Sequence, residues 1–346
     1  MDKTHPTPET DYRIRLSLSG GSGMPIQTLL DCPQKFKHIL DGWRQRLKPI
    51  YFIEGSVFHR CAEDIILNKG FKTVEDIQIY SDEIFSSGEF YDADKDKTVK
   101  FDIEALAYPT KKLKNGEPSP ITKADQARKR LPHMLMQVAL ARAQGRFTGV
   151  KAIERLVQVD TLIDPETGMP DDMARKIADE GIVFSGTIDI DRGDRLEDLK
   201  TCSPSTVKKL TDEEKDIVNN GGYLESNGGF NPATDIQLHK YGYFKTVADA
   251  ELVEDVGFHI FTKHVSKCEY IPLRGKMSVE DHSNIFELAK YAGRAFVWYE
   301  ANGFPKHGYA NNCRNKFGQE CEFKPICFKN KYADPIKAMS NLKREG

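Results

Sequence analysis

The most informative part of the sequence is Gly186-Thr187-Ile188-Asp189-Ile190-Asp191, followed after a turn at Arg192-Gly193-Asp194 by Leu196-Glu197-Asp198-Leu199-Lys200. Strand signals at residues 181–191 and 195–201, joined by these turn residues, predict a hairpin. Side chains alternate across a strand, so Asp198 and Lys200 share one face, while Glu197 and Leu199 point to the other. In a paired hairpin Asp189 can reach the face of Asp198 and Lys200.

Two neighbouring carboxylates, Asp189 and Asp198, could hold Mg²⁺ or Mn²⁺ through their oxygen atoms. Such an ion polarises a phosphodiester and lowers the pKa of a bound water. Lys200 could position that water or stabilise the charge that develops at phosphorus. The pattern therefore suits phosphodiester hydrolysis, and its structural alternative is a surface Asp-x-Lys ion pair on an edge strand.

The hydrophobic pattern around this hairpin predicts one mixed core with helices at both ends, and the chain contains no internal repeat. Further strands are expected at residues 151–163, 253–265 and 269–273, and helices at 54–68, 122–143, 235–247 and 279–302. Pro132 could kink or divide the helix at 122–143. Residues 1–23, which end in Gly20, Gly21 and Gly23, are expected to be a flexible arm. Residues from about 81 to 119 are expected to form a polar insertion beside the core.

Two of the predicted helices carry pairs of functional residues spaced four apart, so that each pair projects from one side of its helix. His59 and Glu63 lie on the first helix, where His59 is a candidate third metal ligand and Glu63 has no firm role. Gln237 and Tyr241 lie on the later helix and could contact a phosphate or a sugar-phosphate backbone.

The order of these elements resembles the PD-(D/E)XK nuclease superfamily, in particular its RecB-like branch. The matching motifs are Gly55-x-x-x-His59, Gly186-x-x-Asp189, Asp198-x-Lys200 and Gln237-x-x-x-Tyr241. The resemblance implies a restriction-endonuclease-like α/β core, with a mixed central β-sheet flanked by helices. It also implies that His59, Asp189 and Asp198 bind the metal, that Lys200 is catalytic, and that Gln237 and Tyr241 support the site or contact DNA. Many relatives carry Glu in place of Asp198, and Asp191 is the substitute ligand if Asp189 and Asp198 are not opposite.

Four cysteines bracket the predicted core: Cys32 precedes it, and Cys313, Cys321 and Cys327 follow it. Four thiolates can hold a tetrahedral zinc ion or a [4Fe-4S] cluster, and either would pin the two ends of the domain together. Zinc sites usually use closely spaced cysteine pairs, which are absent here, so the spacing favours an iron-sulfur cluster. The alternatives are a zinc site or four unrelated cysteines, whereas Cys61, Cys202 and Cys268 are expected to be core residues.

The bracket also resembles the iron-sulfur nucleases of the AddB-type and CRISPR-associated RecB-like families, in which one cysteine precedes the core and three follow it. The Cys32-Pro33-x-x-Phe36 context matches their N-terminal element, while the gap between Cys313 and Cys321 is longer than in many relatives. The resemblance covers about residues 32–327, with residues 81–119 unmatched, and implies a nuclease domain closed at its C-terminal end by a Cys-rich [4Fe-4S] staple. We therefore expect a nuclease domain over residues 24–327 and a basic tail at 328–346. The cluster would be structural, because phosphodiester hydrolysis transfers no electrons.

Composition excludes several other classes of protein. The chain has 346 residues, a formal net charge of −2, 39% hydrophobic and 29% charged residues, which is ordinary for a globular protein and excludes collagen, long coiled coil and a histone-like polycation. No stretch approaches the roughly 18 apolar residues that a membrane helix needs. The start lacks the apolar segment of a signal peptide. We therefore expect no membrane partner and a cytoplasmic protein, encoded by a cell or a virus.

DNA is the expected partner, with backbone contacts from local basic residues. The candidates are Lys35, Lys37, Arg44, Arg46, Lys48, Arg128, Lys129, Arg130, Lys208 and Lys209. Tyr241, Tyr243 and Phe244 could stack on unpaired bases. The expected function is a metal-dependent DNase with little sequence preference, an exonuclease more than an endonuclease. It would act on single strands or duplex ends in recombination, repair, replication or CRISPR adaptation, with any helicase supplied by a partner. The alternative is an inactive nuclease fold that binds DNA or protein.

Overall fold

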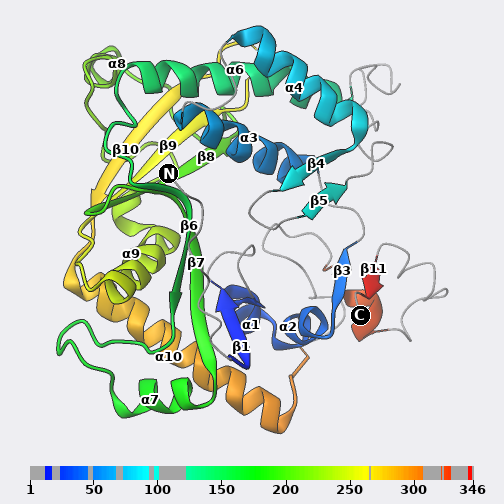
Figure 1. Ribbon diagram of the computed structural model, residues 1–346, viewed down its shortest axis with the longest axis vertical. Helices are drawn as coiled ribbons and strands as arrows, with labels where there is room; N and C mark the ends of the chain where they lie inside the picture. The colour runs from blue at the N-terminus through cyan, green and yellow to red at the C-terminus, as the bar shows by residue number, and fades with distance from the viewer. Residues whose placement is uncertain are drawn as a thin grey trace.

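The computed structural model describes residues 12–17, 24–45, 50–67, 73–92, 97–100, 122–264, 266–306, 321, 323–328 and 342–344. Within these residues a seven-stranded sheet forms the centre of the molecule, with strand order β10-β9-β8-β7-β1-β2 and β6 paired to β7 (Figure 1). Its strands are β1 (Ile14–Ser17), β2 (Met24–Pro25), β6 (Ala152–Val159), β7 (Ile182–Asp191), β8 (Arg195–Cys202), β9 (Asp255–Thr262) and β10 (Tyr270–Lys276). The sheet is mixed, because β8 runs parallel to β9 and antiparallel to β7.

Helices cover both faces of the sheet (Figure 1). On one face lie α3 (Ile50–Ile66), α4 (Val74–Ser87) and α6 (Lys123–Ala143), and buried side chains of these helices pack with Ile190, Leu199 and Phe261 of the sheet. On the other lie α9 (Ile236–Asp249) and α10 (Val279–Asn302), which pack against β1, β6 and β7. The remaining elements are α1 (Ile26–Asp31), α2 (Pro33–Leu40), β3 (Trp43–Gln45), β4 (Glu89–Asp92), β5 (Lys97–Lys100), α7 (Asp172–Asp179), α8 (Asp212–Asn219), η1 (Pro232–Thr234), α11 (Lys324–Cys327) and β11 (Leu342–Arg344).

Reciprocal side-chain caps fix where several helices begin. Thr122 accepts from the backbone N–H of Asp125, whose carboxylate accepts from the N–H of Thr122, and Ser278 and Asp281 repeat the arrangement at α10. Each such cap satisfies two of the backbone donors that a helix start leaves open. The predicted break at Pro132 does not occur, because α6 continues through this residue.

The hairpin of the sequence prediction is present. Ile190 pairs with Glu197 and Asp191 with Leu196. In the turn Gly193 has a φ of 98°, a left-handed conformation that suits glycine, and its N–H donates to the Asp191 carboxylate at 2.7 Å. The four longer predicted helices and the other predicted strands also correspond to α3, α6, α9, α10, β6, β9 and β10.

Two segments differ from the sequence prediction. Residues 14–17, assigned to the flexible arm, form β1, which pairs in parallel with the start of β7 from Ile182 to Ser185. Residues 81–87, assigned to the polar insertion, belong to α4, where Ile84 and Phe85 are buried in the core. Both assignments failed because a long-range partner stabilises each segment. Residues 101–119 of the predicted insertion lie outside the described residues.

A segment near the C-terminus packs against residues 39–45 at the edge of the molecule (Figure 1). Strand β11, from the predicted basic tail, pairs antiparallel with β3 near the start of the chain (Figure 1). A small core of Cys321, Phe323 and Leu342 packs against Ile39 and Trp43 beneath this pair. Strand pairing and apolar contacts therefore join this C-terminal segment to residues 39–45. In the part of the chain that the structure describes, no helix combines the length and the apolar character needed to cross a bilayer.

Candidate active site

Asp189 of β7 has no paired residue on either neighbouring strand, β6 or β8. The pairing of β7 with β8 stops at Ile190 and Glu197, one residue before Asp189 and Asp198 would face each other. The carboxylate of Asp189 fills the gap and accepts the backbone N–H of Leu199 at 2.8 Å. Asp189 and Asp198 are thus the first residues of β7 and β8 beyond their paired segment.

Glu154 of β6 stands opposite Asp189 on the other edge of β7. The ladder between β6 and β7 pairs Ile153 with Ile190 and Arg155 with Ile188, but not the two residues between them. Glu154 has a φ of 51°, a left-handed conformation that costs a non-glycine residue about 1–3 kcal/mol. This backbone distortion turns the Glu154 carboxylate away from the regular ladder and toward the neighbouring helix.

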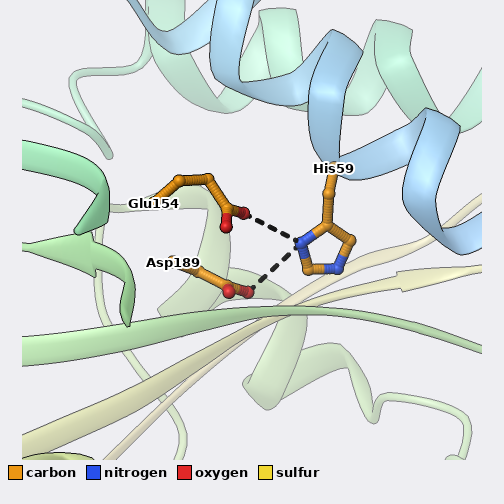
Figure 2. A group of neighbouring side chains, drawn as sticks. All are labelled: His59, Glu154 and Asp189. Carbon is orange, nitrogen blue, oxygen red and sulfur yellow. Dashed lines mark ion pairs between the residues drawn. The ribbon is translucent and has the colours of Figure 1, made fainter. Parts of the chain in front are cut away.

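Glu154 and Asp189 both point at His59 of α3 (Figure 2). The His59 Nδ1 atom lies 3.4 Å from Asp189 Oδ2 and 3.6 Å from Glu154 Oε1. One ligand atom from each residue lies within 4.8 Å of the other two, a combination found nowhere else among the His, Cys, Asp and Glu side chains described. Two ligands on one ion with bonds of about 2.1 Å stand about 3 Å apart, so a small closure would let all three bind one divalent ion.

Asp198 and Lys200 form the second part of the site. The Lys200 Nζ atom lies 2.7 Å from Asp198 Oδ2 and donates to Gln237 Oε1 at 3.0 Å. The Gln237 amide in turn donates to the Tyr241 hydroxyl at 2.8 Å. Gln237 and Tyr241 lie on α9, whose N-cap is Asp235, and together they fix the position of Lys200.

The site concentrates negative charge away from water. Burial raises the pKa of Asp189, and burial together with the Asp189 carboxylate raises the pKa of Asp198 to about 7. Burial lowers the pKa of His59, but attraction to Asp189 and Glu154 outweighs it and raises that pKa to about 9. A divalent cation would relieve this repulsion, so the side chains present fit a metal.

The ammonium of Lys200 stays charged in these surroundings. Burial lowers its pKa, but the carboxylates of Asp198 and Asp189 outweigh burial and raise that pKa above its ordinary value. A lysine held as a cation cannot serve as a general base near neutral pH. Its chemical use is therefore to attract or stabilise negative charge.

Two other predicted roles do not fit the structure. Asp191, the proposed substitute ligand, is only 1% exposed and accepts from Arg155 at 2.5 Å and from the Gly193 N–H, which marks a structural role. Tyr241, Tyr243 and Phe244 are at most 3% exposed, so they cannot stack on bases. They belong to the core beneath α9 because that face of the helix packs on the sheet.

The structure also shows where Glu63 and several of the basic residues predicted to contact DNA lie. Glu63 pairs with Arg60 at 2.6 Å instead of joining His59 in the site. Arg130 is bound to Glu54 by two hydrogen bonds of 3.0 Å, whereas Lys129, Lys208 and Lys209 are exposed. Arg46 and Lys48 lie outside the described residues, as does the side chain of Arg44.

Glu154 is the site residue that sequence reasoning missed. It occupies a predicted strand, where an isolated glutamate reads as a solvent-facing position. Its left-handed φ opposite Asp189 identifies it in the structure, and no sequence pattern predicts that conformation.

Replacement of Glu154 by glutamine should weaken metal binding. Glu154→Gln keeps the size of the side chain but removes its negative charge, so we expect affinity for Mn²⁺ to fall about 10–100-fold. Isothermal titration calorimetry of the purified chain would measure it. Glu225→Gln, in an exposed loop, is the matched control and should bind as the wild type does. Equal affinities of Glu154→Gln and wild type would remove Glu154 from the site.

Three of the four cysteines predicted as cluster ligands, Cys32, Cys321 and Cys327, are among the described residues, and they lie near enough to interact electrostatically. Cys32 is the N-cap of α2, Cys321 is 6% exposed, and Cys327 ends α11. Burial, then interaction with Cys321 and Cys32, raises the pKa of the Cys327 thiol to about 11. Cys313 lies outside the described residues.

The spacing of these thiols bears on the kind of metal group that they fit. Thiolates on one zinc ion stand about 4 Å apart, since Zn–S bonds are about 2.3 Å. Cys32, Cys321 and Cys327 do not form a set within 4.8 Å, although they lie close enough to interact electrostatically. Soft thiolate ligands suit zinc or an iron-sulfur cluster. Cys61 and Cys202 are buried in the core, and Cys268 packs against it, as predicted.

Comparison with known proteins adds little to this picture. No protein-family model matches the chain, and no curated protein matches it. Among solved structures, one similar to this chain is the crystal structure of a candidate exonuclease from Eubacterium rectale, with a TM-score of 0.45 and 12% sequence identity over 90% of this chain and 89% of that chain. This similarity is too low to establish a common family.

Proposed function

We propose that this protein is a metal-dependent DNA nuclease, acting as an exonuclease on single strands or duplex ends. The observation that carries the proposal is the convergence of His59, Glu154 and Asp189 on one point, with the buried pair of Asp198 and Lys200 close by. A surface ion pair, the structural alternative for Asp-x-Lys, would not be buried as Asp198 is, at 2% exposure.

The side chains of the site divide the work of phosphodiester hydrolysis. His59, Glu154 and Asp189 would hold a divalent ion together with Asp198, and the Leu199 N–H fixes the Asp189 carboxylate in place. The bound ion would supply Lewis acidity toward the phosphate and a more acidic water. Lys200 contributes a fixed positive charge where negative charge grows at phosphorus, and Gln237 and Tyr241 keep its ammonium oriented.

The donor set bears on the metal. Carboxylate oxygens suit both Mg²⁺ and Mn²⁺, whereas an imidazole nitrogen is a better ligand for Mn²⁺. We therefore propose Mn²⁺ as the tighter-binding ion and Mg²⁺ as an alternative. Binding also has to displace the proton of His59, whose pKa is about 9 in the metal-free chain.

The other parts of the proposal rest on further features. A [4Fe-4S] cluster on Cys32, Cys313, Cys321 and Cys327 would reinforce the contact that β11 makes with β3. DNA would be bound through exposed basic residues such as Lys208 and Lys209, which follow the active strand β8. A helicase, recombination or CRISPR-adaptation protein would be the partner that supplies unwinding.

The test is digestion of oligonucleotides labelled at the 5′ or the 3′ end, single-stranded or duplex, linear or circular, with Mg²⁺ or Mn²⁺. The proposal predicts stepwise shortening from an end and no cleavage of circles. Cleavage of circular substrates would show an endonuclease. Absence of cleavage under every condition would favour an inactive nuclease fold that only binds DNA or protein.

A further inference from the structure

His38 of α2 contacts one of the predicted cluster cysteines. Its Nε2 atom lies 3.1 Å from the Sγ atom of Cys327, a residue 289 positions later in the chain. Gln34 Nε2 lies farther from the same nitrogen, at 3.5 Å. No pattern in the sequence points to His38, because the cluster motif contains only cysteines.

The surroundings hold this imidazole against the cysteine-bearing segment. His38 is 8% exposed and stacks on the ring of Phe323, with centroids 5.8 Å apart and planes 24° from parallel. Phe323 lies between Cys321 and Cys327 and belongs to the small core under β3 and β11. The position of His38 is therefore set by packing that does not depend on a metal.

The chemistry of the contact fixes its direction once a metal group is bound. A metal-bound cysteine is a thiolate, and its sulfur can only accept a hydrogen bond. A neutral histidine with its proton on Nε2 can donate it. Hydrogen bonds to the sulfurs of an iron-sulfur cluster, together with net charge and burial, set its reduction potential. A donor at this position stabilises the more negative, reduced cluster and hence raises the potential.

We propose that His38 donates its Nε2–H to the Cys327 thiolate, raises the reduction potential of the cluster and protects it from oxidative loss. The inference rests on the iron-sulfur cluster of the proposed function but not on nuclease activity. It makes His38 a positioning residue, since it acts through the ligand Cys327.

The test uses the full chain purified without oxygen. His38→Phe keeps an aromatic ring to stack on Phe323 and removes the donor. His38→Gln retains an N–H donor, and Phe323→Leu removes the stacking partner while His38 stays. Iron and sulfide content, the potential from spectroelectrochemical titration, and the rate of bleaching in air would be measured for each. Metal-dependent cleavage by the same preparations would be measured separately.

We expect His38→Phe to assemble a cluster with a lower potential than wild type and faster bleaching, and His38→Gln to recover part of both. Phe323→Leu should change the potential less than His38→Phe does. Equal potentials and bleaching rates in wild type and His38→Phe would overturn the inference. Complete loss of iron in His38→Phe would also overturn it, because it would make His38 a ligand. A wild type that contains zinc or no iron would overturn it as well. A wild type with the cluster but without cleavage would overturn the proposed function alone.

Discussion

Lys200→Ala should lower the rate of DNA cleavage about 100–1,000-fold, the usual cost of removing one electrostatic stabiliser of a transition state. Lys200 lies 2.7 Å from Asp198 and is oriented by Gln237. Its removal takes away the positive charge at the reacting phosphate. It also leaves Asp198 with less opposing charge, which favours protonation of a carboxylate whose pKa is already about 7. The initial rate of release from end-labelled DNA in Mn²⁺ would measure the loss.

DNA affinity is the control for this variant. Because phosphate contacts elsewhere dominate affinity, Lys200→Ala should bind a phosphorothioate-linked strand almost as tightly as wild type in fluorescence anisotropy. Lys176→Ala, an exposed lysine on α7, should leave both cleavage and binding unchanged. An undiminished cleavage rate in Lys200→Ala would exclude Lys200 from the reaction.

Glu197→Gln should reduce the free energy of unfolding by about 3–5 kcal/mol, the range seen when one partner of a buried ion pair is removed. Glu197 is 1% exposed on the face of β8 opposite Asp198. Its carboxylate lies 2.5 Å from Arg192 Nε, 3.0 Å from His259 Nε2 and 3.1 Å from Arg195 Nε. Glutamine fits the space but leaves the buried guanidinium of Arg192 without its counter-charge. Urea denaturation at pH 7 would measure the loss.

The pH dependence of stability separates this ion pair from general packing effects. Burial raises the pKa of Glu197, but His259, Arg192 and Arg195 outweigh it and lower that pKa from 4.5 to about 2. The stabilisation is therefore complete above about pH 4.5 and is lost as the pH falls toward 2. The difference between wild type and Glu197→Gln should shrink over that interval. A pH-independent difference would contradict the electrostatic explanation, and Glu225→Gln should show no difference at any pH.

The hairpin, its turn and the long helices could be predicted because local patterns specify them. Alternation in residues 182–191 and 195–202 produced strands, and apolar spacing in residues 123–143 and 279–302 produced helices. The relation of Asp198 to Lys200 follows from the period of a strand alone. The prediction that Tyr241, Tyr243 and Phe244 stack on bases was wrong, because a helix sequence does not show which of its faces meets a sheet.

The sequence by itself determined which residues are candidates for the proposed chemistry: Asp189, Asp198 and Lys200 on a hairpin, and His59 on a helix. Only the tertiary structure decided that Glu154 joins them and that His38 touches Cys327. The physical reason is that strand and helix periods are local properties of the chain. The left-handed backbone at Glu154 and the pairing of β11 with β3 depend on partners that folding brings together from distant parts of the sequence.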